Sequence, residues 1–471
     1  MLKERGIDLP PAPAIPKRED SNPCLLSIVQ EQIWRAWRSE PGLYNEVVAL
    51  RLKGSLNVIA LIQALKEVVR RHDILRARFV EVNGQVHQYT SAEFNLEVPL
   101  ADLSYISAAE REAELKLLAE DQVGRAFGLD QLALIRGSIV VLSPSEHMLV
   151  MTLPQIVWDG WSRNILINEL SHFYKSYTEG EESEIGELKR QYRDFAMWQR
   201  ARLEAGEMDR DIEYWRGKLA AGLSPVFAHD SAKPTVKSRK RGSYKLKLSR
   251  VGSEGVKRIG KNQNLTPYMV LLAVWQVLLG RYRGQMEVAV STVAANRNRA
   301  ELLVLIGPVS NTLLIKLDLN GNPSFRQVLR KVCQEVKESI EHQELPLEWL
   351  LSEMRKSEND GQNRVADVMF VMEEEIGEEI LFGGIKAFIE EVAGTLTDSD
   401  LTILMRRRGE EFEGRIEYLT SLFDEETIRH MAAAYGKLIE VVAQDVDCNI
   451  GDLPPFIDLG DDHSRNVPNH Y

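Results

Sequence analysis

Patterns typical of helices and strands alternate along almost the whole chain, and the alternation falls into two successive halves. In the first half, Glu46–Leu52 has the β-branched and apolar composition of a strand, and Asn57 is placed to cap the helix that follows. In the second half, Thr266 and Pro267 form a strong helix start, an N-cap followed by proline. A chain of 471 residues is also too long for one ordinary hydrophobic core. These features predict a mixed α/β (α+β) protein with two lobes.

A hairpin followed by a helix is the clearest local pattern. Two strand-like runs, Leu132–Leu142 and His147–Leu153, are joined by a short polar turn and predict a β-hairpin. The loop Pro154–Gly160 comes next and leads into a helix that begins at Trp161. The acidic stretch Thr178–Glu187 is interpreted as the connection between the lobes, and a solvated loop within one lobe is the alternative.

The two ends of the chain differ in composition from its body. Prolines crowd the first 23 residues and predict an extended lead-in. The last residues are polar, and we expect them to be disordered. The predicted division is therefore a lead-in at 1–23, an N-terminal lobe at 24–180, a C-terminal lobe at 181–456 and a tail at 457–471.

Charge and cysteine usage exclude several classes of protein. The net charge of −12 argues against a nucleic-acid-binding surface, which needs a basic face. The three cysteines show no CxxC spacing, and their odd number argues against a disulfide framework. The longest apolar run, Met269–Leu279, is too short to span a membrane, and the N-terminus lacks the apolar core of a signal peptide. We expect a cytoplasmic protein that binds neither nucleic acid nor membrane and holds no metal ion.

Six short motifs occur in a fixed order along the chain. They are Ser27–Trp34, Arg71–Phe79, Tyr192–Trp198, Ala295–Arg299, Ile306–Thr312 and His342–Glu348. The last of them reads His-Gln-Glu-Leu-Pro-Leu-Glu and is similar to the His-Gln-Asp-x-Pro-Phe-Glu of nonribosomal peptide synthetase condensation domains. One such motif alone is weak, but six in the right order are specific. A further stretch, Arg364–Phe370, keeps little more than the arginine and the strand character of its counterpart. The chain therefore resembles a condensation domain over most of its length.

The resemblance implies a fold and a set of partners. Condensation domains consist of two chloramphenicol-acetyltransferase-like lobes in a V-shaped pseudo-dimer, with the active site in a tunnel between the lobes. Their substrates arrive on the phosphopantetheine arms of carrier proteins, and no cofactor is bound. Multidomain synthetases continue at this point into an adenylation domain, whereas this chain ends soon after Leu453–Pro455. We therefore expect a free-standing domain that meets peptidyl or acyl carrier proteins in trans; the alternative is a piece cut from a larger synthetase.

The family's signature, His-His-x-x-x-Asp-Gly, is altered in this chain. It aligns with Pro154–Gly160, so that Asp159 and Gly160 are kept and both histidines are lost. Gln155 stands at the histidine to which the family's catalytic role is usually assigned. The resemblance also implies that Asp159 is mainly structural and pairs with an arginine. The expected site consists of Gln155, Asp159 and Gly160 at the reaction centre, Pro154, Trp158, Trp161, Ser162, Ser310 and Asn311 around the substrate, and Arg297 or Arg299 as the partner of the aspartate.

The change to Gln155 has a chemical consequence. Amide formation from a thioester requires the attacking amine to lose a proton, and an imidazole accepts it readily near neutral pH. A carboxamide forms hydrogen bonds but cannot store a proton. Losing general-base help typically slows a reaction by ~10²–10⁴-fold. Holding the two reactants together contributes roughly 7–11 kcal/mol in favourable cases. A free α-amine, with a pKa near ~8, is partly neutral at pH 7, whereas a hydroxyl has a far higher pKa and depends more on a base. A retained activity is therefore expected to form amides rather than esters.

Three functions follow from this altered signature. The first is an enzyme that joins a carrier-bound acyl group to an amine by positioning. The second is an inactive condensation-like module that recruits a carrier protein or a tailoring enzyme. The third is an acyltransferase that uses a coenzyme A thioester.

Overall fold

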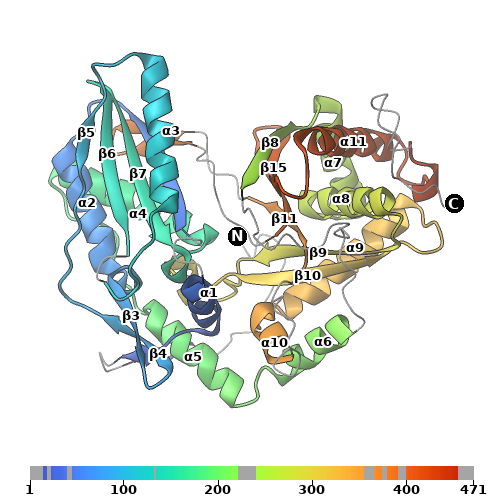
Figure 1. Ribbon diagram of the computed structural model, residues 1–471, viewed down its shortest axis with the longest axis horizontal. Coiled ribbons are helices and arrows are strands. Elements are labelled where there is room, and N and C mark those ends of the chain that lie inside the picture. Colours follow the sequence, from blue (N-terminus) through green and yellow to red (C-terminus); the bar gives the residue numbers. More distant parts are fainter. Residues whose placement is uncertain are drawn as a thin grey trace. The chain divides into compact units, whose positions relative to one another are not determined.

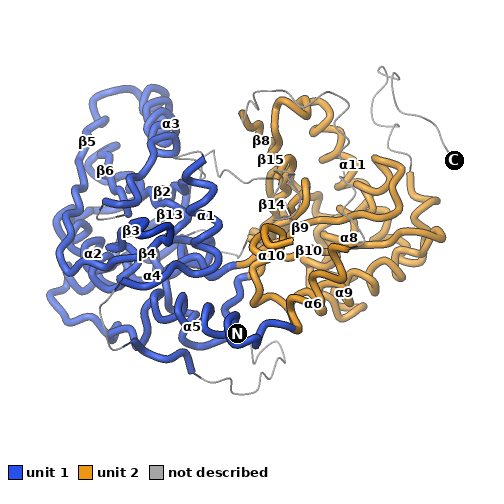
Figure 2. The backbone as a smooth tube through the Cα atoms, turned by 60° about the horizontal axis from the view of Figure 1, so that its bottom comes forward, with its two compact units in different colours: residues 1–209, 295–310, 377–396 blue, residues 210–294, 311–376, 397–471 orange. Residues whose placement is uncertain are grey.

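The computed structural model describes residues 14–18, 23–39, 45–131, 134–220, 240–354, 365–373, 379–390 and 399–454. The chain divides into two compact units (Figure 2). Unit 1 consists of Met1–Asp209, Ala295–Ser310 and Gly377–Leu396, and unit 2 consists of Arg210–Ala294, Asn311–Ile376 and Thr397–Tyr471. Both units combine helices with a β-sheet, which confirms the predicted two-part α/β class.

A six-stranded sheet forms the centre of unit 1. Its strands, in spatial order, are β12 (Ile380–Phe382), β13 (Ile385–Glu390), β2 (Asn45–Lys53), β7 (Glu146–Pro154), β6 (Arg136–Ser143) and β5 (Leu100–Asp102). All neighbours are antiparallel except β5 and β6, which run parallel. The pairing of β6 with β7 confirms the predicted hairpin.

Helices cover both faces of this sheet (Figure 1). Helices α2 (Val58–Arg71) and α4 (Gly160–Glu179) pack on one face in the main core of unit 1, whereas α3 (Ala108–Gly124) packs on the other face. The Asn57 side chain accepts a hydrogen bond from the Ala60 amide, as predicted for the N-cap of α2. The remaining elements of unit 1 are β1 (Cys24–Leu25), α1 (Ile28–Ser39), η2 (Asp73–Arg76), β3 (Ala77–Val82), β4 (Gln85–Thr90), η3 (Gln155–Val157), α5 (Tyr192–Glu204) and η4 (Ala300–Val304).

Unit 2 contains a second six-stranded sheet. Its strands, in spatial order, are β10 (Asn311–Asp318), β9 (Glu287–Ala294), β11 (Val368–Met372), β14 (Leu401–Arg408), β15 (Glu411–Leu419) and β8 (Arg241–Lys247). Its helices and turns are α6 (Asp209–Ala220), α7 (Arg250–Gln263), α8 (Pro267–Arg283), α9 (Phe325–Glu341), α10 (Leu347–Met354), α11 (Glu425–Gln444) and η6 (Ile450–Asp452). Every residue of α8 from Met269 to Gly280 is buried, so the predicted central helix is confirmed.

Each unit is built from stretches that are far apart in the chain, and the sequence does not reveal this. Unit 1 continues past residue 180 and includes Thr178–Glu187, which agrees with the alternative of a loop within one lobe. Strand β13 joins unit 1 because it pairs with β2, more than 300 residues earlier in the chain. The lobe boundary at 180/181 therefore remains a prediction. The first division between the two compact units lies instead between Asp209 and Arg210. The predicted tail at 457–471 lies outside the described residues.

Candidate functional site

The altered signature lies where strand β7 becomes helix α4. Pro154 is the last residue of β7 and pairs with Asn45 at the end of the β2–β7 ladder. Its missing N–H therefore lies at the end of the ladder and does not interrupt it. Residues 155–157 form the short turn η3. Within this turn, the Ile156 carbonyl accepts a hydrogen bond from Gln30 Nε2 at 3.0 Å. Gly160, the first residue of α4, is exposed, and a Cβ built on it would meet no atom within 4 Å. The backbone at Gly160 is therefore exposed, and its contact with a substrate stays a prediction.

Asp159 is the centre of a buried hydrogen-bond network. It caps α4, because its Oδ1 accepts from the Ser162 amide at 2.9 Å and from Ser162 Oγ at 2.6 Å. Its Oδ2 accepts from the Val309 and Ser310 amides, both at 3.1 Å, and from Ser310 Oγ at 2.9 Å. One carboxylate thus joins the start of α4 to the segment at 295–310 of the same unit.

Arg297 completes this network. Its Nη2 donates to both oxygens of Asp159, at 3.0 and 3.1 Å, and to the Gly307 carbonyl at 3.1 Å. Its Nη1 donates to the carbonyls of Leu302 and Leu305. The Arg297 side chain is only 1% exposed, so the ion pair is shielded from water. The sequence left two arginines open, and the structure selects Arg297.

The charge of Asp159 is fixed by these contacts. Burial by itself raises the pKa of Asp159, but the Arg297 charge and the hydrogen bonds from Ser162 and Ser310 outweigh it and hold that pKa below its ordinary value. A carboxylate that stays ionised and accepts this many hydrogen bonds is a poor proton carrier. A scaffolding role for Asp159 is consistent with these contacts and stays a prediction.

Gln155 has a partner that the sequence did not indicate. Its Nε2 donates to Glu46 Oε1 at 3.1 Å, and Trp158 Nε1 donates to Glu46 Oε2 at 2.5 Å. Burial raises the pKa of Glu46, and the hydrogen bonds from Trp158 and Gln155 only partly offset this. The signal in the sequence is the one acidic residue of β2, which directly precedes the apolar run Val47–Leu50. Trp158 itself is 1% exposed and packs in the core of unit 1.

The other predicted residues have different surroundings. Trp161 is partly buried, and its Nε1 donates to the Leu303 carbonyl at 3.2 Å. The guanidinium of Arg299 lies 4.5 Å from the ring centre of Trp198. Asn311 begins β10 of unit 2, and its Nδ2 donates to the carbonyls of Gln343 and Glu344. The structure thus joins Asp159, Ser162, Arg297 and Ser310 in one network and Gln155 and Trp158 in another, whereas the side chains of Asn311 and Arg299 make other contacts.

No histidine in the described part of the chain hydrogen-bonds to Gln155, Asp159 or Glu46. His72 Nε2 pairs with Glu169 at 2.8 Å, and His342 Nδ1 pairs with Asp211 at 2.6 Å. His147 lies at the other end of β7, opposite Leu52. Within the same ranges, no group of three or more His, Cys, Asp or Glu side chains is arranged to hold a metal ion. No described helix is long and apolar enough to cross a membrane.

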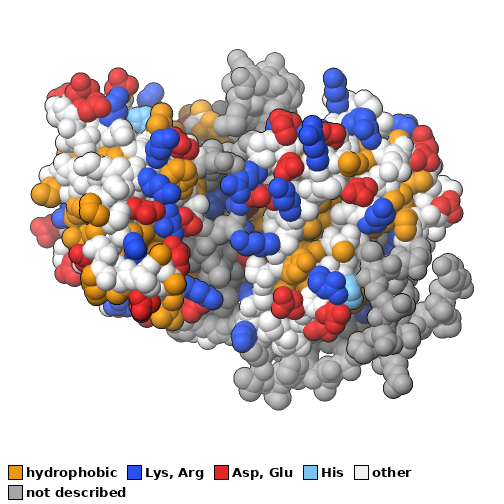
Figure 3. Space-filling view, turned by 90° about the horizontal axis from the view of Figure 1, so that it is seen from above, with side chains coloured by type: hydrophobic (Ala, Val, Ile, Leu, Met, Phe, Trp, Pro, Cys, Tyr) orange, Lys and Arg blue, Asp and Glu red, His pale blue; other side chains and the backbone are white. Residues whose placement is uncertain are grey.

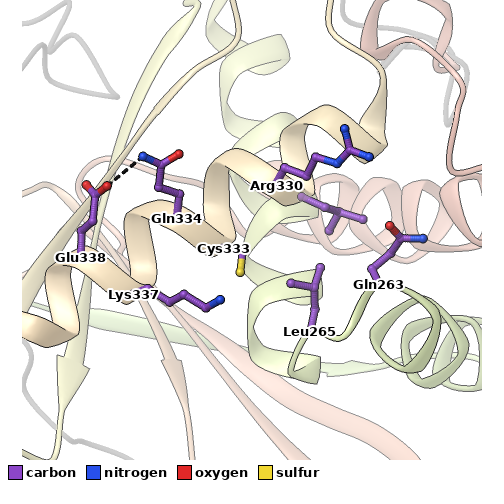
Figure 4. Close-up of a pocket in the computed structure, with 8 residues that line it drawn as sticks. Gln263, Leu265, Arg330, Cys333, Gln334, Lys337 and Glu338 are labelled. Carbon is purple, nitrogen blue, oxygen red and sulfur yellow. Dashed lines mark hydrogen bonds between the residues drawn. The ribbon is translucent and has the colours of Figure 1, made fainter.

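A separate hollow of about 380 Å³ lies in unit 2, between α9 and the turn that joins α7 to α8 (Figure 4). Its walls include Leu265, Arg330, Cys333 and Lys337. None of the predicted site residues lines it. Elsewhere on the surface, basic and acidic side chains are interspersed over both units in the view of Figure 3.

Comparison with known proteins gives a consistent result. The model of the family "Condensation domain" matches residues 21–455. The chain is 33% identical over 438 residues to one of the linear gramicidin synthase proteins of Brevibacillus parabrevis, and the match covers 91% of the chain and 8% of that protein. It is 31% identical to the phosphinothricin tripeptide synthetase PhsC of Streptomyces viridochromogenes, over 94% of the chain and 41% of that protein. The chain thus spans less than half of either relative.

Solved structures are similar over nearly the whole chain. The X-domain in a complex with OxyB from teicoplanin biosynthesis has a TM-score of 0.82 and 25% identity, covering 96% of this chain and 99% of that one. The starter condensation domain of the rhizomide synthetase RzmA, in complex with C8-CoA, has a TM-score of 0.80. It is 17% identical and covers 92% of this chain and 98% of that one, so it supports the fold alone.

Proposed function

The chain belongs to the condensation-domain family of nonribosomal peptide synthetases, and we propose that it forms an amide bond between a carrier-bound acyl thioester and an amine without the usual histidine. Members of this family work on substrates tethered to carrier proteins. We propose that this chain receives its carriers in trans and binds no cofactor of its own.

The observation that carries this proposal is the intact scaffold around Asp159. The Asp159–Arg297 pair and its hydrogen bonds hold the start of α4 and the segment at 295–310 in one arrangement. The loop that bears Gln155 ends at this scaffold, so the position of the loop is fixed although its imidazole is lost. A fixed loop favours catalysis by positioning, which can contribute more than a general base does.

The proposed reaction exchanges one bond at the acyl carbon. The amine nitrogen attacks the thioester carbonyl carbon, the C–N bond forms, and the C–S bond breaks. The nitrogen loses one proton, and the departing sulfur gains one to become the thiol of the carrier arm. The backbone N–H of exposed Gly160 is available to stabilise negative charge on the carbonyl oxygen.

The test uses two separate carrier proteins, one loaded with an acyl thioester and the other with an aminoacyl thioester. Intact-protein mass spectrometry follows the acceptor carrier, whose mass should rise by the mass of the acyl group only when the chain is present. An unchanged mass, with both carriers shown to bind the chain, would refute the proposal. Replacing the donor carrier by a free coenzyme A thioester identifies an acyltransferase that needs no carrier.

A recruiting role is the second candidate, because one similar structure is a complex. The X-domain of teicoplanin biosynthesis, which is 25% identical to the chain, was solved together with OxyB. The chain would then present a carrier-bound peptide to a tailoring enzyme without reacting itself. Analytical ultracentrifugation of the chain with a candidate tailoring enzyme tests this role. Sedimentation as two independent species would count against it.

A further inference from the structure

Glu46 occupies an unusual place in unit 1. It is paired with Leu153 across the β2–β7 ladder and is one residue from the pair Asn45–Pro154 at the end of that ladder. Side chains alternate along a strand, so Glu46 shares its face with Val48 and with the other inward residues of β2. That face packs in the apolar core beneath α2 and α4. A carboxylate therefore stands at the edge of an apolar layer, next to the altered signature.

Its partners are neutral. Gln155 Nε2 donates to one oxygen and Trp158 Nε1 to the other. Among the described residues, no lysine or arginine forms an ion pair with Glu46. The charge of Arg163 on α4 lowers the pKa of Glu46, and the charge of Asp159 raises it.

A purely structural role explains this arrangement poorly. Burying a carboxylate without a cationic partner costs free energy, which a neutral side chain of similar size would avoid. Asp159, by contrast, has its cation and several backbone donors. Glu46 and Gln155 are each partly exposed, whereas Trp158 behind them is buried. The two polar groups therefore meet the solvent at the position of the lost imidazole.

We propose that Glu46 is the proton acceptor of this site, and that Gln155 and Trp158 hold its carboxylate in place; this inference rests on the proposed amide-forming function. The amine attacks the thioester carbon, the C–S bond breaks, and the proton from the nitrogen passes to Glu46. Glu46 then gives that proton to the thiolate, so that the products are the amide and the thiol and the carboxylate is restored.

The electrostatics of the site fit this role. Burial raises the pKa of Glu46 above its ordinary value, and this brings it nearer to the pKa of an α-ammonium group, about 8. Proton transfer is more favourable when the pKa values of the proton donor and the proton acceptor are close. Because the base must be ionised to act, the rate should rise with pH through the raised pKa of Glu46, in addition to the rise that deprotonation of the amine gives near pH ~8.

Two measurements test the proposal, with Glu112→Gln as the control. Glu112 is an acidic residue of the same unit whose side chain is 63% exposed and which pairs with Arg51 on the opposite face of the sheet. The first measurement is the single-turnover rate of amide formation between loaded carriers as a function of pH. Glu46→Gln should lower the plateau by ~10²–10⁴-fold and remove the part of the acidic limb that Glu46 sets, leaving the part set by the amine. Carrier binding should stay unchanged, and the control should behave as the wild type.

The second measurement does not depend on turnover. The indole N–H resonance of Trp158, assigned with Trp158→Phe, should shift with pH as Glu46 gains its proton, and the shift should vanish in Glu46→Gln. If Glu46→Gln fails to fold, Glu46→Asp keeps the carboxylate and should retain the acidic limb at a reduced rate.

The outcomes separate this proposal from the proposed function. An active Glu46→Gln variant with an unchanged pH profile overturns the role of Glu46 and leaves the amide-forming function standing. An indole resonance that does not respond to pH over the range in which the protein stays folded also overturns it, since protonation of a carboxylate bonded to that N–H would shift the resonance. A wild-type protein that binds both carriers but forms no amide overturns both proposals.

Discussion

Replacing Asp159 by asparagine tests whether this residue is a scaffold. The substitution keeps the shape of the side chain, so it leaves no cavity, but it removes the charge opposite Arg297. The amide also places an NH₂ group where one carboxylate oxygen accepts from backbone and hydroxyl donors. Removing one partner of a buried ion pair typically costs about 3–5 kcal/mol, because the other charge remains buried. We expect Asp159→Asn to lower the free energy of unfolding by about this amount.

Equilibrium urea unfolding at neutral pH, followed by tryptophan fluorescence and far-UV circular dichroism, measures the change. The m-value should stay the same while the midpoint falls. Glu187→Gln is the matched control in the same unit, since Glu187 is 74% exposed and pairs with exposed Arg70. Exposed pairs typically contribute less than about 1 kcal/mol. A midpoint for Asp159→Asn that is indistinguishable from that of the control would refute the reasoning.

The pH dependence of the free energy of unfolding tests the same role of Asp159. The pKa of Asp159 is lowered in the folded protein, so its stabilising contribution is present above the ordinary aspartate pKa and is lost as the pH falls through the folded value. The stability of the wild type should therefore converge toward that of Asp159→Asn at low pH. A difference between the two proteins that stays constant through the whole acid range, down to the unfolding of both, would contradict this assignment.

Three further predictions concern neighbouring residues. Gly307→Ala should destabilise the fold by about 2–4 kcal/mol in urea unfolding, because φ is 147° and the added Cβ would lie 2.0 Å from the Tyr192 ring; a wild-type midpoint would show that the ring moves freely. Gln155→His should not raise the single-turnover rate of amide formation, because Glu46 already serves as the base and Gln155 holds its carboxylate; a rise of ~10²-fold would show that the lost imidazole limits the reaction. Trp158→Phe should move the acidic limb of the pH–rate profile to higher pH, since it removes a hydrogen bond that lowers the pKa of Glu46. An acidic limb at the same pH as in the wild type would contradict the effect of this hydrogen bond on Glu46.

Local sequence patterns predicted much of the fold. The hairpin, the cap of α2 and the buried helix α8 depend on residues close together in the chain, so periodicity and capping rules identify them. The interchange of segments between the units depends on long-range strand pairing. Nothing near Ile385–Glu390 indicates that this strand pairs with β2 rather than with its neighbours in sequence.

The site was predicted only where the resemblance supplied motif residues. Asp159 meets Ser162 and Ser310, which were expected around the substrate and not as its partners, and the choice between Arg297 and Arg299 requires coordinates. The segment around them is not a regular strand, and Asn296 has a positive φ of 52°, so simple alternation does not give the side-chain directions. Glu46 was missed because its contact with Gln155 joins residues more than 100 positions apart.

The motifs themselves gain a physical explanation from the structure. Tyr192 donates its hydroxyl hydrogen to the Pro308 carbonyl at 2.8 Å, and its oxygen lies 2.8 Å from Ser27 Oγ. Gly307 is required beside it, since any side chain there would collide with the Tyr192 ring. Residues from three separate motifs thus support the segment that binds Asp159.

The most direct test of the account is the rate constant for acyl transfer from the donor carrier to the acceptor carrier under single-turnover conditions, with the chain in excess. We predict a rate well above that of the two carriers alone, even though Gln155 occupies the position of the imidazole. A rate equal to the background, measured with both carriers bound, would contradict the account and would leave the recruiting role as the better description.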